Sequence, residues 1–266
     1  MADADAYFEQ VDTPDGTAYR PTGHAQGPWN PEFQHFGPPG ALLTRELERC
    51  AGDDLPLARI SFDILGPVPL RPLTVRAEVE RPGRRVRLVR AELLTEGRVV
   101  ALAAGWGVQP APEDVPIDTG SAQKPPSPRP QAPGAPPEVP DHWRCGFLES
   151  VEWSFVHGGY ETLGPAAVWL RPRIPLLPDE PMSPTQRTVL CADSANGVSA
   201  VLDIRQYGFV PPELTLHLLR PPAGEWLCLD ADTELGPGHA GLTCAMLQDE
   251  HGPVARSAQS LLVHRR

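Results

Sequence analysis

ISFDILGP, residues 60–67, opens a segment in which apolar and polar side chains alternate. The alternation continues in three further runs, which are separated by turns that include residues 81–84 and 95–98. A period of two places every second side chain on one face of a strand, and short turns join strands that run in opposite directions. Residues 58–106 are therefore predicted to form an antiparallel meander with one apolar face.

The same pattern returns in the second half of the chain. LTLHLLRP, residues 214–221, matches residues 60–67, and the turn segment 247–254 matches the turn segment 92–99. Self-similarity of this kind is the signature of a duplicated unit. Strands are predicted here at residues 213–219, 226–234, 239–248 and 253–264, and earlier in the chain at residues 6–9, 17–20, 147–155 and 166–173.

One helix is predicted before each meander. In the first half, Leu43 and Leu47 follow helical spacing within residues 41–50. In the second half an apolar run ends at Asp193, and apolar residues follow at helical spacing as far as Leu202. Asp is a preferred N-cap because its side-chain oxygen accepts the unpaired N–H groups of the first turn. The second helix is therefore expected to begin at Asp193.

These elements predict an α+β fold, the double hotdog, in which each of two repeats wraps a curved antiparallel sheet around one helix. The boundaries are residues 1–109 for the N-terminal hotdog, 110–140 for a linker and 141–266 for the C-terminal hotdog. The linker contains eleven prolines, a composition that favours extended and solvated backbone. Pairing of edge strands would join the repeats into one sheet, and further pairing into a homo-oligomer is compatible with this fold.

Composition and charge narrow the classes of partner. The net charge is −11 and the basic residues are scattered, which argues against nucleic acid or an anionic membrane as a partner. No apolar run approaches the roughly 20 residues of a membrane span. The acidic start, Met1 to Asp5, lacks the pattern of a signal peptide, so a cytoplasmic protein is expected. The five cysteines and eight histidines show no metal-ligand spacing, so neither a metal nor another cofactor is expected.

The chain resembles the acyl-CoA thioesterases of the double-hotdog, thioesterase-II-like class, over nearly its whole length outside the linker. The resemblance implies hydrolysis of acyl-CoA to free fatty acid and CoA, within fatty acid metabolism and with acyl-CoA as the substrate. The segments that carry it are His35-Phe36-Gly37, residues 169–173, residues 192–197 and residues 215–222, which include Arg220-Pro221.

In that family an Asp, a hydroxyl residue and a Gln hold the nucleophilic water. The resemblance puts Asp193 at the Asp position and Gln259 at the Gln position. Thr215 lies on the corresponding strand, but the family's Thr sits somewhat earlier, where this chain has Pro211 and Pro212. Asp193 is then expected to act as general base on the water, with free N–H groups of its helix facing the developing oxyanion.

The internal repeat provides a comparison for this site. Counted from the turn glycines Gly97 and Gly252, Gln259 corresponds to Ala104 in the first half. One half therefore has a polar group where the other has a methyl group. A duplicated fold with one surviving site is expected to show this asymmetry.

Two other classes of function stay open. A hotdog hydratase or dehydratase acting on acyl thioesters would need a histidine beside the carboxylate, and no histidine is close to Asp193 in the sequence. His35 and His217 are interpreted as structural or exposed, and Cys191 as a core residue. A non-catalytic acyl-CoA-binding protein is the second alternative, favoured by the displaced Thr. A serine hydrolase is disfavoured because the chain has no Gly-x-Ser-x-Gly motif.

Overall fold

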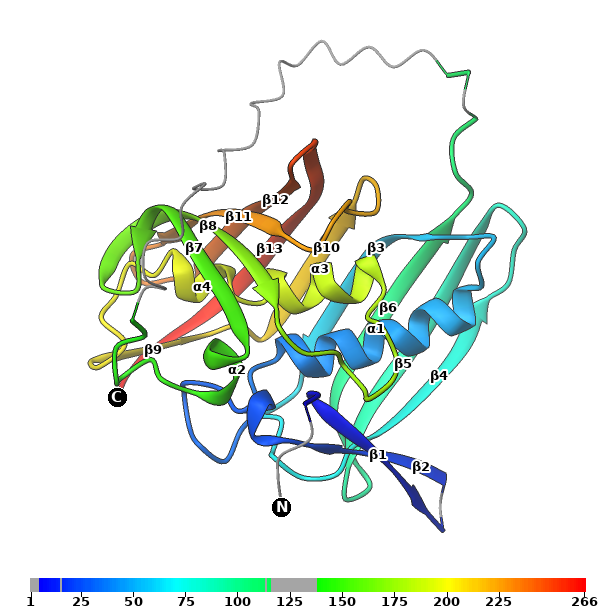
Figure 1. The fold of residues 1–266 in the computed structure, drawn as a ribbon, viewed down its shortest axis with the longest axis horizontal. Helices are drawn as coiled ribbons and strands as arrows, with labels where there is room; N and C mark the ends of the chain where they lie inside the picture. Colours follow the sequence, from blue (N-terminus) through cyan, green and yellow to red (C-terminus); the bar gives the residue numbers. More distant parts are fainter. Residues whose placement is uncertain (1–4, 15, 113, 116–137) are drawn as a thin grey trace.

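An eleven-stranded antiparallel sheet is the main element of the structure, a computed structural model that describes residues 5–14, 16–112, 114–115 and 138–266 (Figure 1). Residues 116–137 of the predicted linker lie outside the described residues. The sheet and a small number of helices confirm the predicted α+β class.

The first half contributes four strands, β3 (Leu57–Ile64), β4 (Thr74–Arg81), β5 (Val86–Thr95) and β6 (Arg98–Val108). The second half contributes seven, β7 (Val151–Gly159), β8 (Thr162–Pro172), β9 (Tyr207–Val210), β10 (Glu213–Leu218), β11 (Leu227–Leu235), β12 (Gly241–Asp249) and β13 (Gly252–Arg265).

The two halves share this sheet through their edge strands. The strand order is β4-β5-β6-β3-β10-β13-β12-β11-β8-β7, and β9 pairs with β13. The predicted meander is confirmed for β4, β5 and β6, whereas β3 pairs with β6 instead of β4. At the junction β3 pairs antiparallel with β10, and Ser61 lies opposite Thr215. The expected pairing of the repeats therefore occurs within one chain.

The predicted first helix is α1 (Gly37–Ala51). Leu42, Leu43 and Leu47 are fully buried, and the helix packs against β4, β5 and β6. Figure 1 shows α1 and the helices of the second half, α3 (Pro184–Ala192) and α4 (Ala195–Val198), on the same side of the sheet. This apolar layer between helices and sheet is the core on which the site is built.

The prediction that a helix begins at Asp193 is wrong. Asp193 is the C-cap residue of α3, which begins after Ser183. The Ser183 hydroxyl accepts the N–H of Gln186, and the Gln186 side chain accepts the N–H of Ser183, so the two residues form a capping box. This start signal lies upstream of the apolar run, which therefore belongs to the helix that ends at Asp193 and not to one that begins there.

The predicted correspondence between Gln259 and Ala104 is also wrong, by one residue. Ala104 pairs with Ser61, and Ala258 pairs with Thr215, so Ala104 corresponds to Ala258 and Gln259 corresponds to Gly105. The turn glycines caused the error, because they occupy different places in their turns: Arg98 closes the first turn, one residue after its glycine, whereas Gly252 itself closes the second. A shift of one residue moves a side chain to the other face of a sheet.

The strands predicted at residues 6–9 and 17–20 correspond to β1 (Phe8–Thr13) and β2 (Gly16–Pro21), which form a hairpin beside β4. Two short helices, η1 (Gly23–Ala25) and α2 (Gly146–Glu149), contact each other near the start of α1.

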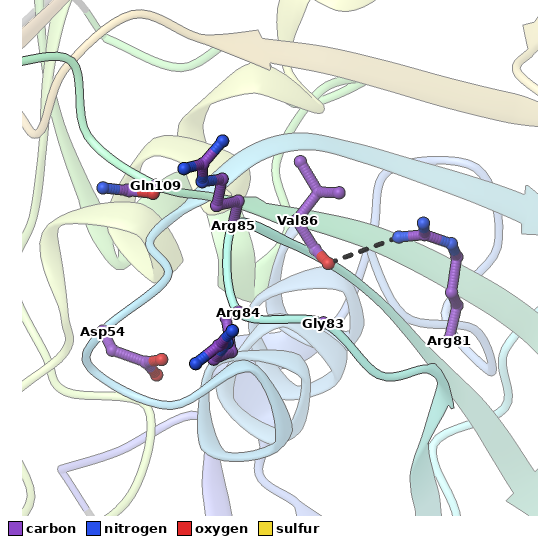
Figure 2. Close-up of a pocket in the computed structure, with 7 residues that line it drawn as sticks. All are labelled: Asp54, Arg81, Gly83, Arg84, Arg85, Val86 and Gln109. Atoms are coloured by element: carbon purple, nitrogen blue, oxygen red, sulfur yellow. Dashed lines mark hydrogen bonds between the residues drawn. The ribbon is translucent and has the colours of Figure 1, made fainter.

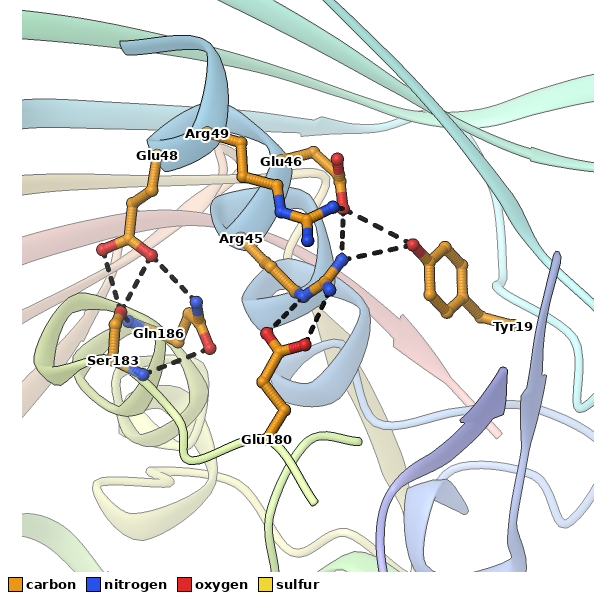
Figure 3. Close-up of polar contacts among 8 residues, drawn as sticks. All are labelled: Tyr19, Arg45, Glu46, Glu48, Arg49, Glu180, Ser183 and Gln186. Carbon is orange, nitrogen blue, oxygen red and sulfur yellow. Dashed lines mark hydrogen bonds and ion pairs between the residues drawn. The ribbon is translucent and has the colours of Figure 1, made fainter. Parts of the chain in front are cut away.

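Figure 3 shows how α1 is tied to the hairpin and to the segment before α3. Arg45, which is only 5% exposed, donates to both carboxylate oxygens of Glu180 at 2.6 and 2.7 Å. It also donates to the hydroxyl of Tyr19 in β2 at 3.2 Å and to Glu46 at 2.5 Å. A buried guanidinium needs several such acceptors to offset its desolvation. The network therefore fixes the position of α1 relative to its neighbours.

Candidate active site

Asp193 lies against His35, a residue 158 positions earlier in the chain. Asp193 Oδ2 is 2.9 Å from His35 Nδ1, and the side chains of His35 and Asp193 are 11% and 5% exposed. His35 comes two residues before α1, and Asp193 ends α3, so the contact forms where the two helices meet. A β-carbon at Gly37 would lie 2.7 Å from the carbonyl oxygen of Leu190, which is closer than real side chains approach. Glycine at position 37 therefore allows the close approach that brings the pair together.

The imidazole of His35 is held on two further sides. Its ring stacks on Phe147 of α2, with centroids 3.7 Å apart and planes inclined by 9°. The backbone nitrogen of Gly37 lies 3.1 Å from Nδ1. Nδ1 either carries a proton and donates to Asp193 or lacks one and accepts from Gly37, because one ring nitrogen cannot do both. With Asp193 ionised, the proton is on Nδ1, and the lone pair of Nε2 is free to accept a proton.

Beside the pair lies a cleft of about 400 Å³. Its polar lining includes His35, Asp193 and Asn196, and the Asn196 side chain is fixed by donating to the carbonyl of Phe209 at 3.0 Å. Its apolar lining comes from both halves of the chain and comprises Trp29, Phe33, Phe36, Ile64, Pro67, Val68, Val210, Pro211, Pro212 and Leu262. A mostly apolar cleft with a few converging polar groups is the usual form of a small-molecule site.

Gln259 is not among the residues that line this cleft. It is fully buried on the inner face of β13, and neither atom of its amide group has a hydrogen-bond partner within the described part of the chain. Its neighbour across the sheet is Thr243, which shares a hydrogen bond with Thr233, and Thr233 shares another with Ser199 after α4. Gln259 thus ends a buried polar row on the inner face of the second half.

Thr215 is not brought together with the other predicted residues. Its neighbours Leu214 and Leu216 are fully buried and face inward, so Thr215 points to the outer face of the sheet. Its hydroxyl donates to Glu213 at 3.5 Å. The structure therefore places Thr215 and Gln259 on opposite faces.

His35 is the member of this pair that the sequence interpretation missed. His35 was interpreted as a structural residue because no carboxylate lies near it in the sequence. The structure shows that the carboxylate comes from the other half of the fold. The available signal was the segment His35-Phe36-Gly37, which carries part of the family resemblance.

Cys191, two residues before Asp193, is not a nucleophile in this arrangement. Its side chain is buried, and this burial raises the pKa of the thiol to about 12. The thiol stays protonated near neutral pH, whereas the thiolate is the reactive form. The interpretation of Cys191 as a core residue agrees with its burial.

A second hollow, of about 680 Å³, lies near the far end of α1 (Figure 2). Arg81, Arg84 and Arg85 line it together with Asp54, which follows α1, and Arg81 donates to the carbonyl of Val86 at 3.4 Å. A helix rises about 1.5 Å per residue, so α1 separates this hollow from His35 by roughly 20 Å. Its lining contains no histidine, and its guanidinium groups favour anions over acid–base chemistry.

Residues 5–14, 16–112, 114–115 and 138–266 contain no group of three or more His, Cys, Asp or Glu side chains that could hold a metal ion. None of the helices in this part of the chain is long and apolar enough to cross a membrane.

Comparison with protein families gave two matches that together cover most of the chain. Residues 25–107 match the acyl-CoA thioesterase N-terminal domain, and residues 124–263 match the acyl-CoA thioesterase C-terminal domain. Comparison with curated proteins gave no match.

Solved structures similar to this chain include three thioesterases or thioesterase-like proteins. A putative thioesterase II from Thermobifida fusca YX is 20% identical, with a TM-score of 0.73 over 97% of this chain and 96% of that one. A putative thioesterase from Novosphingobium aromaticivorans DSM 12444 is 22% identical, with a TM-score of 0.67 over 95% and 97%. An acyl-CoA thioesterase II from Mycobacterium marinum is 17% identical, with a TM-score of 0.65 over 97% and 95%.

A conserved protein with a hot dog fold from Alicyclobacillus acidocaldarius is 15% identical, with a TM-score of 0.67 over 99% of this chain and 97% of that one. These likenesses confirm the double-hotdog fold.

Proposed function

Because the chain belongs to the acyl-CoA thioesterase family, we propose that it hydrolyses acyl thioesters of coenzyme A and that the His35–Asp193 pair activates the attacking water. The observation that carries the proposal is the 2.9 Å contact between Nδ1 and Oδ2 at the wall of an apolar cleft. A histidine held by a carboxylate in this way keeps its proton on the bonded nitrogen and presents the other nitrogen as a base.

In the proposed reaction, His35 Nε2 removes a proton from water as the water oxygen adds to the thioester carbonyl carbon. Asp193 stabilises the imidazolium that forms. The tetrahedral intermediate then expels the CoA thiolate, which takes the proton from His35, and the products are a carboxylic acid and CoA. General base catalysis of this kind contributes about 10²–10⁴ to the rate.

The N–H groups that were expected to face the oxyanion do not start at Asp193, because α3 ends there. At the start of α1, residues 38 and 39 are prolines and have no N–H, and the N–H of Gly40 is bonded to the carbonyl of Phe36. The N–H of Gly37 points at His35 Nδ1.

This proposal changes the role expected for Asp193 from general base to partner of the base. The predictions that Gln259 and Thr215 orient the water stay untested, and the outer-face position of Thr215 counts against its part in it. Predictions that also remain are the location in the cytoplasm, the place in fatty acid metabolism and the assembly into a homo-oligomer.

A hydratase or dehydratase acting on acyl thioesters is the second candidate. This activity needs a histidine beside the carboxylate, and the contact between His35 and Asp193 supplies one. An imidazole base beside a carboxylate suits the addition of water to an enoyl thioester as well as it suits hydrolysis.

One assay separates these functions from each other and from acyl-CoA binding without reaction. The purified protein is incubated with saturated acyl-CoAs of several chain lengths and with the corresponding 2-enoyl-CoAs. Release of free thiol from the saturated substrates is the expected result. Loss of enoyl absorbance without thiol release would favour the hydratase, and binding with neither reaction would favour the non-catalytic alternative.

A further inference from the structure

A small pocket of about 40 Å³, here called the inner pocket, is lined by His35. Trp29, His35 and Asn196 line both this pocket and the outer cleft, so the two spaces adjoin at these residues. The rest of its lining includes three aromatic side chains, Trp143, Trp153 and Tyr160, together with Leu148, Ser194 and Gly197.

Two hydroxyl groups of this lining have no hydrogen-bond partner within the described part of the chain. They are Ser194 Oγ and the phenolic oxygen of Tyr160, and both atoms are buried. Ser194 is 4% exposed, and the ring of Tyr160 is held edge-on by Trp153 and Phe155. Burial raises the pKa of Tyr160, so its O–H stays a donor. Buried hydroxyls without partners cost free energy, so native structures normally satisfy them, often with an ordered water.

The size of the inner pocket limits what can bind there. One water occupies about 30 Å³ in the liquid, and a buried water normally has two to four polar partners. A volume of about 40 Å³ is therefore suited to a water and too small for an acyl chain or a pantetheine arm, for which the outer cleft offers about 400 Å³. His35 borders both spaces, so a water in the inner pocket can contact His35 where the pocket adjoins the outer cleft.

We propose that the inner pocket binds the hydrolytic water and that Ser194 and Tyr160 position it for His35. This proposal rests on the proposed thioester hydrolysis. The two hydroxyls orient the water through hydrogen bonds. His35 accepts one proton from the water, and the water oxygen adds to the carbonyl carbon of the thioester bound in the outer cleft. Ser194 and Tyr160 are thereby further positioning residues of the reaction.

The test compares steady-state hydrolysis of one acyl-CoA by the wild type, Tyr160→Phe, Ser194→Ala and the double variant. Removing one hydroxyl is expected to lower kcat roughly five- to tenfold, and removing both is expected to lower it by up to about a hundredfold. KM should stay within about twofold, because the substrate does not contact these hydroxyls. Tyr207→Phe in β9 and Ser260→Ala on the outer face of β13 are the matched controls.

Gly197→Ala provides a second variant in which the fold is expected to stay intact. A β-carbon at this position would meet Trp143 at 3.8 Å, an ordinary contact, and Ala is favoured over Gly in a helix such as α4. The added methyl group narrows the inner pocket and is expected to displace the water. The kcat should therefore fall at least about tenfold, while the melting temperature stays unchanged.

Unchanged kcat in both the double variant and Gly197→Ala would overturn the proposal. A rise in KM at unchanged kcat would also overturn it, because the hydroxyls would then bind substrate and not water. If the wild type releases no thiol at all, the proposed function fails, and the proposal fails with it. His35→Gln, assayed alongside, shows how far kcat falls when the base is removed and the two hydroxyls stay in place.

Discussion

At the scale of single residues, His35 and Asp193 depend on each other. The carboxylate determines which ring nitrogen carries the proton, and the imidazole gives the buried carboxylate a partner at 2.9 Å. The contact therefore joins the start of α1 to the end of α3 and holds the imidazole at the wall of the cleft.

Asp193→Asn is expected to lower kcat by about 10²–10⁴. The asparagine amide is close in size to the carboxylate, but its NH₂ group can donate to Nδ1 and so favours the tautomer whose proton lies on Nε2. That tautomer cannot accept a proton from water. Thiol release measures the effect, and Asp232→Asn, on an exposed position of β11, is the control. An Asp193→Asn protein with wild-type kcat would contradict the role of the pair.

Thr215→Val is expected to leave kcat within about twofold of the wild type, since Thr215 lies on the outer face of the sheet and valine is at least as favourable in a strand. The assay is the same measurement of thiol release. A large loss of activity would mean that Thr215 reaches the site by a rearrangement, and it would restore the role that the family resemblance implies.

Gln259→Leu is expected to raise the free energy of unfolding by about 1–3 kcal/mol, because it removes two buried polar atoms that lack partners. Urea denaturation measures this change, and a destabilised variant would mean that the amide is satisfied in solution. The kcat of the same variant tests the separate prediction that Gln259 orients the water.

At the scale of elements, the capping box of α3 positions the carboxylate at the opposite end of the helix. The Ser183 hydroxyl also donates to Glu48 of α1 at 2.8 Å, so the cap ties the two helices together (Figure 3). Ser183→Ala should therefore lower the free energy of unfolding by about 1–2 kcal/mol. Ser260→Ala, on the outer face of β13, is expected to have little effect. Equal stabilities of the two variants would argue against the cap.

The turn between β12 and β13 depends on a buried carboxylate. Asp249 is fully buried and accepts two bonds from Arg220, both of 2.6 Å, and one each from the N–H groups of Ala223 and His251. Burial alone would raise the pKa of Asp249, but these bonds outweigh it and hold the pKa well below its usual value. In the first half, Thr95 occupies the position of Asp249, and the turn residue Glu96 forms an exposed ion pair with Arg71 at 2.7 Å.

The sign of the resulting pH dependence follows from the lowered pKa. The stability that the Asp249 charge contributes is present above the ordinary pKa of about 3.9 and is lost as the pH falls towards the folded-state value. Asp249→Asn should therefore be less stable than the wild type at pH 7, and the difference should shrink at pH 3. Thermal unfolding at the two pH values measures it. A difference independent of pH would contradict the role of the charge.

Much of the fold could be predicted from the sequence because strand alternation and turn residues are local signals. The helix α1 and the meander β4-β5-β6 illustrate this. The second helix was predicted to begin too late because Asp193 was interpreted as its N-cap. Ser183 and Gln186, which form the capping box, mark the earlier start. Gln259 was matched to Ala104 instead of Gly105 because Gly97 and Gly252 occupy different positions in their turns.

The His35–Asp193 pair could not be predicted from local signals. It depends on how two helices from different halves pack, and that depends on the pairing of β3 with β10 and on the close approach at Gly37. The apolar run drew attention to Asp193 and the family resemblance implied its role, but neither indicated its partner.

At the scale of the whole molecule, the shared sheet and the packed helices predict that both halves unfold together. β3 pairs with β10, and α1 packs on α3, so neither half buries its core alone. Circular dichroism and tryptophan fluorescence should follow a single transition with one midpoint in urea. Two separated transitions would mean that each hotdog is stable by itself.

The central claim is that a base held by Asp193 drives thioester hydrolysis in the cleft formed by both halves. The most direct measurement is thiol release from acyl-CoA by His35→Gln beside the wild type, with melting temperatures recorded for both. We predict that the wild type releases CoA and that His35→Gln is at least about a hundredfold slower at a similar melting temperature. A folded His35→Gln protein that hydrolyses acyl-CoA at the wild-type rate would contradict the claim.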